Sequence, residues 1–146
     1  MTRRWHNLLA ARDGVVAMEF AIIASALMML TLGTIEFGRL LWTQEALNAT
    51  AIQTARCIGV LSSSCASAGA YNSADATSYA VTTASGWGVT LTDADITPSN
   101  SGASSACTGD AEVSITYTFE SVVPGLLTML AGGAVLTAQA CFPNQT

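Results

Sequence analysis

The sequence predicts an α+β fold in which one long N-terminal helix packs on a small antiparallel sheet. Residues 15–35 are almost entirely apolar, and apolar side chains then recur at steps of three or four as far as residue 58, which indicates one continuous helix. Residues 112–120 instead alternate apolar and polar side chains, as a strand with one buried face does. The 146 residues therefore accommodate this helix and one small domain.

The first part of the helix is long enough to cross a membrane. Residues 15–35 contain a single charged residue, Glu19, and at a rise of about 1.5 Å per residue they form a helix about 31 Å long, which matches the hydrocarbon core of a bilayer. Arg3, Arg4 and Arg12 precede this segment, and positive flanks remain on the cytoplasmic side. We therefore expect a cytoplasmic N-terminus and an extracytoplasmic body.

The second part of the helix, residues 36–58, has the pattern of a helix buried on one side. Glu36, Arg39 and Glu45 are expected to face water, and Gly59 is a natural end for the helix. Trp42 follows the apolar segment and has the character of a membrane-interface residue. The buried face is predicted to consist of Leu40, Leu47, Ala51, Ala55 and Ile58.

Three small side chains share one face of the predicted membrane span. Ala17, Ala21 and Ser25 are spaced at four-residue intervals, which would let a second helix approach closely. Alanine is also common in membrane helices without any such role, so both interpretations stay open.

The residues after the helix begin with a loop and a second, shorter helix. Residues 61–70 are rich in serine, alanine and glycine and predict a loop. Asn72 or Ser73 is a suitable N-cap for a helix that runs to about Ser85, before the glycines around Trp87 end it.

The remainder predicts three strands joined by polar or glycine-containing connections. Residues 89–91 predict a short strand, and residues 92–110 predict a long polar loop. The strand over residues 112–120 places its apolar side chains on one face. Residues 124–133 predict a turn or short helix that leads into a last strand, residues 134–141.

Four cysteines lie in the expected extracytoplasmic part, where two disulfides are the usual outcome in a small domain. If the last two strands run antiparallel as neighbours, the approach to Glu112 lies near Cys141, and Cys107 is a few residues away. This geometry predicts a Cys107–Cys141 pair and leaves Cys57–Cys65 across a short loop. A pairing of Cys65 with Cys107 is also sterically possible.

The composition excludes several classes of function. The sequence has no lysine, its only histidine is His6, and the residues after Gly14 hold two arginines against nine acids. This balance argues against nucleic-acid binding, and it leaves no histidine-assisted triad or lysine Schiff base. No cysteine pair has metal-ligand spacing, and Asp93 and Asp95 read as a solvated turn. We expect no catalytic residues, no metal, no cofactor and no small-molecule substrate.

The segment at the start of the helix resembles a known processing site. Gly14 follows a basic segment and is followed by four residues, Glu19 and Phe20. This arrangement resembles the prepilin cleavage site of the type IV pilin superfamily, and the Glu-Phe pair resembles its Tad (Flp) branch. The order of a long helix, a small helix and closing strands resembles the TadE-like minor pseudopilins over nearly the whole chain.

The resemblance implies a pilin-like fold and cleavage by a prepilin peptidase between Gly14 and Val15. Glu19 and Phe20 would then serve in assembly, with the Glu19 carboxylate placed against the α-amine of a neighbouring subunit. Such a partner is needed because an ionised carboxylate at membrane depth costs about 2.5 kcal/mol or more. The first-turn helix dipole returns only about 0.3 to 1 kcal/mol.

The expected domains are a cleaved cytoplasmic leader, a transmembrane helix, its extracytoplasmic continuation and a periplasmic α+β domain, at residues 1–14, 15–35, 36–58 and 59–146. The implied partners are the prepilin peptidase, other Tad pilins and pseudopilins, the assembly platform and membrane lipid. The implied location is the bacterial inner membrane, with incorporation into a surface pilus as a further step.

Two other functional classes compete with this interpretation. One is a periplasmic adhesin or sensor domain held by an uncut single-pass anchor, which the N-terminal sequence of the membrane form would distinguish. The other is a small membrane-bound hydrolase, which the absence of a nucleophile and base pair disfavours.

Overall fold

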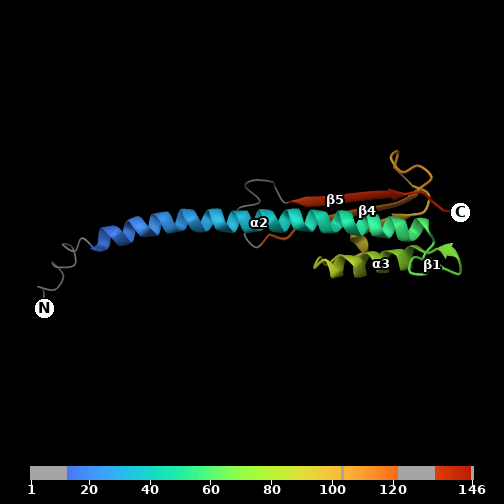
Figure 1. Ribbon diagram of the computed structural model, residues 1–146, viewed down its shortest axis with the longest axis horizontal. Helices are drawn as coiled ribbons and strands as arrows, with labels where there is room; N and C mark the ends of the chain where they lie inside the picture. The colour runs from blue at the N-terminus through green and yellow to red at the C-terminus, as the bar shows by residue number, and fades with distance from the viewer. Residues whose placement is uncertain (1–12, 103, 122–133, 146) are drawn as a thin grey trace, which may run out of the picture. The chain divides into compact units, whose positions relative to one another are not determined.

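The computed structural model describes residues 13–102, 104–121 and 134–145. They form the helices α2 (Asp13–Gly59) and α3 (Ser73–Gly86), a short 3-10 helix η2 (Asp93–Asp95) and five strands (Figure 1). This arrangement confirms the predicted α+β fold. The chain divides into two compact units, Met1–Phe37 and Gly38–Thr146, which are described separately.

The first unit is described only as helix, and its side chains are almost all exposed. The exposed fraction is 59% for Val15, 72% for Phe20 and 60% for Ile35. By length and composition, α2 is the one helix in the described part of the chain that is suited to cross a membrane. A helix of this length with an apolar exterior is stable in lipid, where its backbone groups are bonded internally.

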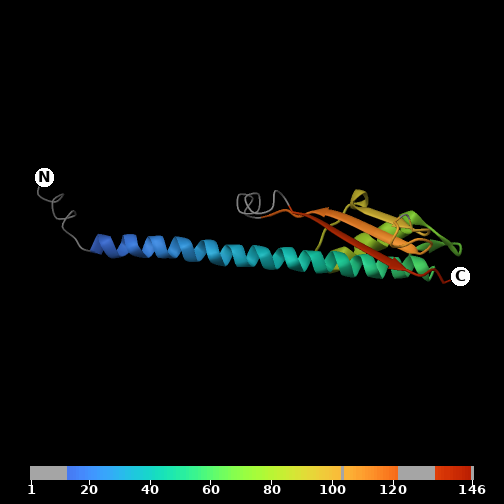
Figure 2. The same cartoon turned by 90° about the horizontal axis from the view of Figure 1, so that it is seen from above.

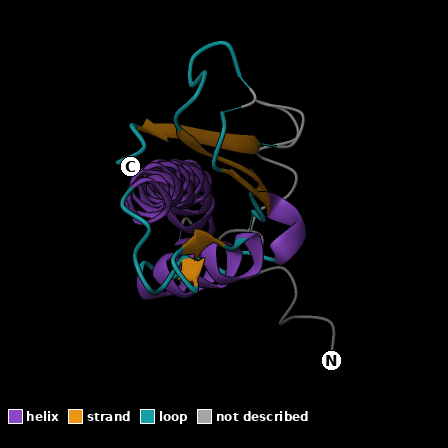
Figure 3. Ribbon diagram, turned by 90° about the vertical axis from the view of Figure 1, so that its right-hand side faces the viewer, coloured by secondary structure: helices purple, strands orange, loops and turns teal. Residues whose placement is uncertain are grey.

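The second unit places both helices on one side of a three-stranded sheet. Figure 3 shows the later half of α2 and α3 together on the same face. Figure 2 shows β5 (Val135–Phe142) running along the later half of α2. The core that they share is apolar and rich in alanine, which lets the two helices approach the sheet closely. Its fully buried members include Leu47, Ala51, Ala55, Ile58, Ala76, Ala80, Ala84, Val113 and Ile115.

The sheet has the order β3-β4-β5 and is antiparallel throughout. Strand β3 spans Ile96–Ser99 and β4 spans Ala111–Thr118. On the inner face Val113 pairs with Ala140 and Ile115 with Ala138, so apolar residues meet across the strands. The outer face carries hydroxyl and amide side chains, which explains the alternation in the sequence.

The two predicted closing strands are correct to within two residues at each end. The structure gives Ala111–Thr118 and Val135–Phe142 where the sequence predicts residues 112–120 and 134–141. The pairing continues just beyond the strands, because the Phe119 N–H donates to the Ala134 carbonyl at 2.9 Å. The connection predicted over residues 124–133 lies outside the described residues.

The prediction of a strand at residues 89–91 is wrong, and the long polar loop predicted over residues 92–110 is wrong for residues 93–99, which form η2 and β3. Val89 and Leu91 are buried at 5% and 6% exposure, but they have no strand partner. The alternation of these two apolar residues with threonines therefore reflects the burial of their side chains and not a strand. The strand at this edge is β3, which forms four pairs with β4 although Pro98 interrupts its sequence.

The loop predicted over residues 61–70 contains a small hairpin. Strands β1 (Ala66–Ser67) and β2 (Ala70–Tyr71) pair across a two-residue turn. Both turn residues, Ala68 and Gly69, have positive φ, at 53° and 79°. Such a turn matches the twist of the paired strands, so the hairpin forms despite an alanine at a position that favours glycine.

The helix boundaries agree closely with the sequence. Asn72 caps α3, because its side chain accepts a hydrogen bond from the Ala74 N–H, and the helix ends at Gly86. Helix α2 ends at Gly59, where an added Cβ would lie 2.6 Å from a ring carbon of Phe142.

The prediction that Glu36 faces water is wrong. Glu36 is only 4% exposed, while Arg39 and Glu45 are exposed as predicted. A charged side chain in sequence suggests solvent, but burial depends on what packs over it in three dimensions.

Candidate functional site: the start of the long helix

Gly14 and Val15 lie in the first turn of α2, and both are exposed. A Cβ placed on Gly14 would meet nothing within 4 Å. Glycine inside a helix costs about 0.5 to 1 kcal/mol relative to alanine, so the fold gains nothing from glycine here. The described fold therefore gives no structural reason for a glycine at this position.

Glu19 lies one helical turn beyond Val15 on the same side of α2, because residues four apart are neighbours on a helix. Its side chain is exposed, and it makes no hydrogen bond or ion pair within the described part of the chain. Phe20, 72% exposed, is adjacent to it. The arrangement presents one carboxylate next to one aromatic ring in the segment of α2 that has no other charged residue, residues 15–35.

The small-residue face and Glu19 point in different directions. Ala17, Ala21 and Ser25 are all exposed and lie along one face. At 100° per residue, Glu19 is about 200° around the helix from Ala17, on the opposite side. A neighbouring helix packed on the small-residue face is therefore not the one that contacts Glu19.

The hydroxyl groups of the first unit are satisfied by the helix itself. Ser25, Thr31 and Thr34 each donate to a backbone carbonyl three or four residues earlier, at 2.8, 3.0 and 2.9 Å. In hydrocarbon an unbonded hydroxyl costs several kcal/mol, so these bonds make the segment compatible with lipid. Glu19 is then the one side chain of residues 15–35 whose polar group is left for an external partner.

The cysteines occur in the two predicted pairs. Cys57 and Cys65 have Cα atoms 5.9 Å apart, and Cys107 and Cys141 have Cα atoms 5.4 Å apart, both within the range of a disulfide. The first pair closes the loop after α2. The second joins the loop before β4 to the end of β5, opposite Glu112 in the register.

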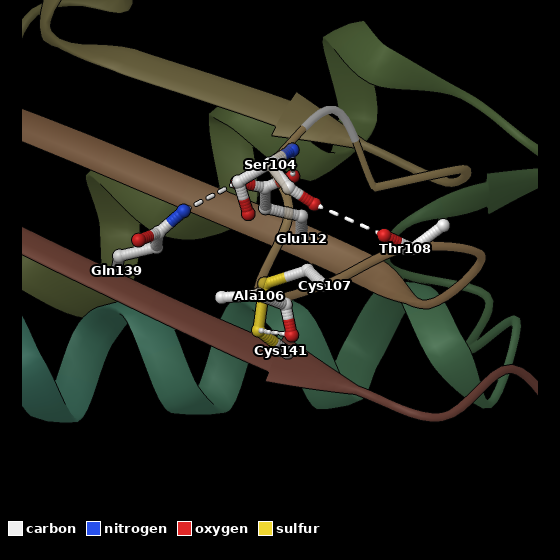
Figure 4. Close-up of a disulfide and its surroundings, with 7 residues drawn as sticks. All are labelled: Ser104, Ala106, Cys107, Thr108, Glu112, Gln139 and Cys141. Atoms are coloured by element: carbon white, nitrogen blue, oxygen red, sulfur yellow. Dashed lines mark hydrogen bonds between the residues drawn. A yellow bond between two sulfur atoms is a disulfide. The ribbon is translucent and has the colours of Figure 1, made fainter.

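Glu112 is a buried carboxylate on the outer face of the sheet, which sequence reasoning missed. It is 5% exposed and accepts hydrogen bonds from the Ser104 backbone N–H, at 2.9 Å, and from the Gln139 amide (Figure 4). The loop that contains Cys107 therefore folds back over this face. Only the strand register, not local sequence, places Gln139 near the carboxylate.

Both outer strands of the sheet have a backbone carbonyl covered by a side chain. The Tyr71 hydroxyl donates to Pro98 on β3 at 3.0 Å, and the Gln44 amide donates to Thr137 on β5 at 3.0 Å. Burial raises the pKa of the Tyr71 hydroxyl, against a smaller lowering by its hydrogen bond with Ser73. Proline lacks an N–H and is tolerated in an edge strand at a position whose N–H would point away from the neighbouring strand.

Aromatic contacts at the start of the second unit were also not predicted. The Arg39 guanidinium lies 5.6 Å from the centre of the Phe119 ring, a cation–π distance. Trp42 and Trp87 make an edge contact with ring centres 6.1 Å apart. These partners are 80 and 45 residues apart in sequence, so no local pattern indicates them.

The aspartates of the predicted polar loop form a local turn. The Asp95 carboxylate accepts hydrogen bonds from the backbone N–H and the hydroxyl of Thr92, at 2.8 and 2.7 Å. It therefore serves as a cap for η2.

The geometry defines a helix with an apolar, lipid-compatible first part and a small disulfide-containing domain. In a comparison with known families, residues 14–56 match the model of the TadE-like protein family. This match begins at Gly14 and confirms the resemblance predicted from the sequence over the helical segment. No match was found among curated proteins or among solved structures.

The matched segment indicates a function at a coarse level. TadE-like proteins are structural components of Tad pili and are not an enzyme family, and association with other pilus components is implied for them. The apolar helix is able to anchor the chain in a membrane. The match does not extend over the sheet domain.

Proposed function

We propose that this protein is a minor pseudopilin of a Tad-type pilus or secretion apparatus. In this proposal a prepilin peptidase cuts it between Gly14 and Val15, and the mature chain assembles with partner pilins through α2. The carrying observation is Glu19, a lone carboxylate without a described partner on an exposed apolar helix that matches the TadE-like family.

The position of Gly14 supports cleavage. The fold does not need glycine there, since its surroundings are open, and a glycine in a helix is unfavourable. A peptidase that must bring a backbone carbonyl against its catalytic carboxylates requires such an unobstructed residue. The domain boundaries at residues 14, 35 and 58 follow from this proposal together with the length of the apolar segment.

The exposure of Glu19 supports assembly through the helix. Removing an ionised carboxylate from water without a partner costs at least about 2.5 kcal/mol. A new α-amine at Val15 of a neighbouring subunit supplies the opposite charge. The small-residue face of Ala17, Ala21 and Ser25 then remains for a second neighbour, because it lies on the other side of the helix.

Mass spectrometry of the membrane-bound protein tests the cleavage step. In cells that contain the matching peptidase, the mature chain should begin at Val15, and in cells without it the chain should keep Met1. Gly14→Val should block cleavage even when the peptidase is present. An intact Met1 in peptidase-containing cells would instead identify an uncut anchor carrying a periplasmic adhesin or sensor domain.

Co-purification with the other pilus subunits tests the assembly step. Glu19→Ala should insert in the membrane and be cut, because the helix becomes more apolar, but its recovery with partner subunits should fall at least tenfold. Thr34→Ala is the matched control, since that hydroxyl bonds only to its own helix at Leu30. Equal recovery of the two variants would show that Glu19 has no part in assembly.

A further inference from the structure

Two tryptophans that are distant in sequence form one exposed aromatic surface in the second unit. Trp42 lies on α2 and Trp87 is the C-cap of α3, with ring centres 6.1 Å apart. The Trp42 indole N–H donates to the Trp87 carbonyl at 3.3 Å. Trp42 is 59% exposed and Trp87 is 40% exposed. The contact holds both rings in place while much of each faces outward.

A shallow cavity lies against this pair. Its volume is about 180 Å³, and it is lined by Trp42, Glu45, Ala46, Ala49 and Trp87. The alanines leave room beside the rings. Glu45 provides the only charged group of the lining, so the cavity is apolar with one negative edge.

The position of the pair along the chain indicates what covers it. Trp42 follows the predicted membrane span by seven residues, or two helical turns, and the exposed apolar side chains of α2 continue through Phe37 and Leu41. A helical side chain leans toward the N-terminus, so the Trp42 ring covers the preceding turn. Headgroup layers add about 5 to 7 Å to each side of the hydrocarbon core, which brings this ring to their level.

We propose that Trp42 and Trp87 together form a site for the interfacial layer of the lipid bilayer. Tryptophan is enriched at this depth because its ring is apolar while its edge is polar. Glu45 fits the ammonium group of a zwitterionic headgroup and disfavours an anionic one. Trp87 thus joins the end of α3 to the membrane surface, a role that its own sequence neighbourhood does not suggest.

This inference rests on the proposed membrane anchoring, and it adds Trp87 as a second contact with lipid. The Trp42 N–H is bonded to the Trp87 carbonyl, so Trp42 contributes the apolar face of its ring to the lipid contact and no hydrogen bond to a headgroup. A partner protein that covered the same rings would shield them from lipid and from soluble quenchers alike.

Fluorescence quenching of the full chain in phosphatidylcholine vesicles tests the proposal. Trp5→Phe/Trp42→Phe leaves Trp87 as the only tryptophan, and lipids brominated at different depths report its position. Bromine near the headgroup end of the chain should quench Trp87 at least twofold more than bromine near the bilayer centre. Soluble iodide should quench it weakly.

The control carries Val60→Trp as its only tryptophan, with the three native tryptophans replaced by Phe. Val60 is as exposed as Trp87, at 40%, but lies just beyond the end of α2 at Gly59, 18 residues after Trp42. It should be quenched by iodide and not by brominated lipid. The proposal is overturned if Trp87 behaves like this control, or if neither quencher reaches it.

Flotation of the same vesicles distinguishes a failure of the proposed lipid contact of Trp87 from a failure of the proposed membrane anchoring. A chain that floats with the vesicles but gives no lipid quenching of Trp87 overturns this inference and leaves the membrane anchoring intact. A chain that does not float overturns both. The variant Trp5→Phe/Trp87→Phe, which keeps Trp42, should show the same depth profile as the Trp87 variant.

Discussion

Removal of the Cys107–Cys141 bridge should destabilise the sheet domain more than removal of the Cys57–Cys65 bridge. The two pairs are separated by 34 and 8 residues. In the chain-entropy model, closing these loops stabilises the folded state by about 3.8 and about 2.6 kcal/mol. The difference of about 1.2 kcal/mol comes from the unfolded chain, so the folded structure need not change.

The assay is urea unfolding of the full chain in detergent micelles, followed by tryptophan fluorescence. The variant Cys107→Ser/Cys141→Ser is compared with Cys57→Ser/Cys65→Ser, so each keeps one bridge. Hydrogen bonds from Ser104 and Gln139 to Glu112 still hold the loop in the folded state of the first variant. A larger loss of unfolding free energy in the second variant would refute the reasoning. A cross-linked peptide containing Cys57 and Cys141 would show that the strand order is wrong.

Three further predictions concern the stability of the second unit, measured by the same unfolding assay. Gly102→Ala should lower the free energy of unfolding by at least about 2 kcal/mol, because Gly102 has a φ of 52° and the new Cβ would lie 1.6 Å from the Cys107 carbonyl oxygen. The control Gly69→Ala, with open space and a φ of 79°, should lower it by about 1 kcal/mol. Equal losses in the two variants would contradict the close approach at Gly102. Ile115→Ala should cost about 2 to 5 kcal/mol, since this side chain is fully buried, and a cost below 1 kcal/mol would place it outside the core. Because burial raises the pKa of Tyr71, the stability that this group contributes is fully present below pH 10.0 and is lost as the pH rises beyond it. In Tyr71→Phe the free energy of unfolding should therefore decline less above pH 10.0 than in the unchanged protein. An equal decline in both proteins would assign the effect to another group.

The predictable parts of the fold are those whose pattern is local. The end of α2 at Gly59 and the cap of α3 at Asn72 depend on residues within one turn, and the sequence shows them directly. The pairing of β4 and β5 can also be predicted from the sequence, because the alternation of apolar and polar residues in both strands determines which face is buried. In the antiparallel register Glu112 lies opposite Cys141, so Cys107 comes near Cys141.

The parts that sequence did not reveal are those decided by distant partners. Strand β3 contains Pro98 and only four residues, and it is a strand because the edge of β4 is open to it. Glu112 has the alternation of an outward-facing residue, yet it is buried by a loop that folds over it. From the sequence, Trp87 is predicted only to lie at the end of a helix, because its contact with Trp42 forms only in the folded domain.

The edges of the sheet bear on how subunits of this kind join. An exposed edge strand invites another strand to pair with it. Here β3 carries Pro98, whose missing N–H weakens such pairing, and the Tyr71 hydroxyl already occupies its carbonyl. On the other edge Gln44 occupies the carbonyl of Thr137. These contacts disfavour growth of the sheet from subunit to subunit. In the proposed function, assembly instead uses the exposed face of α2, where Glu19 has no partner among the described residues.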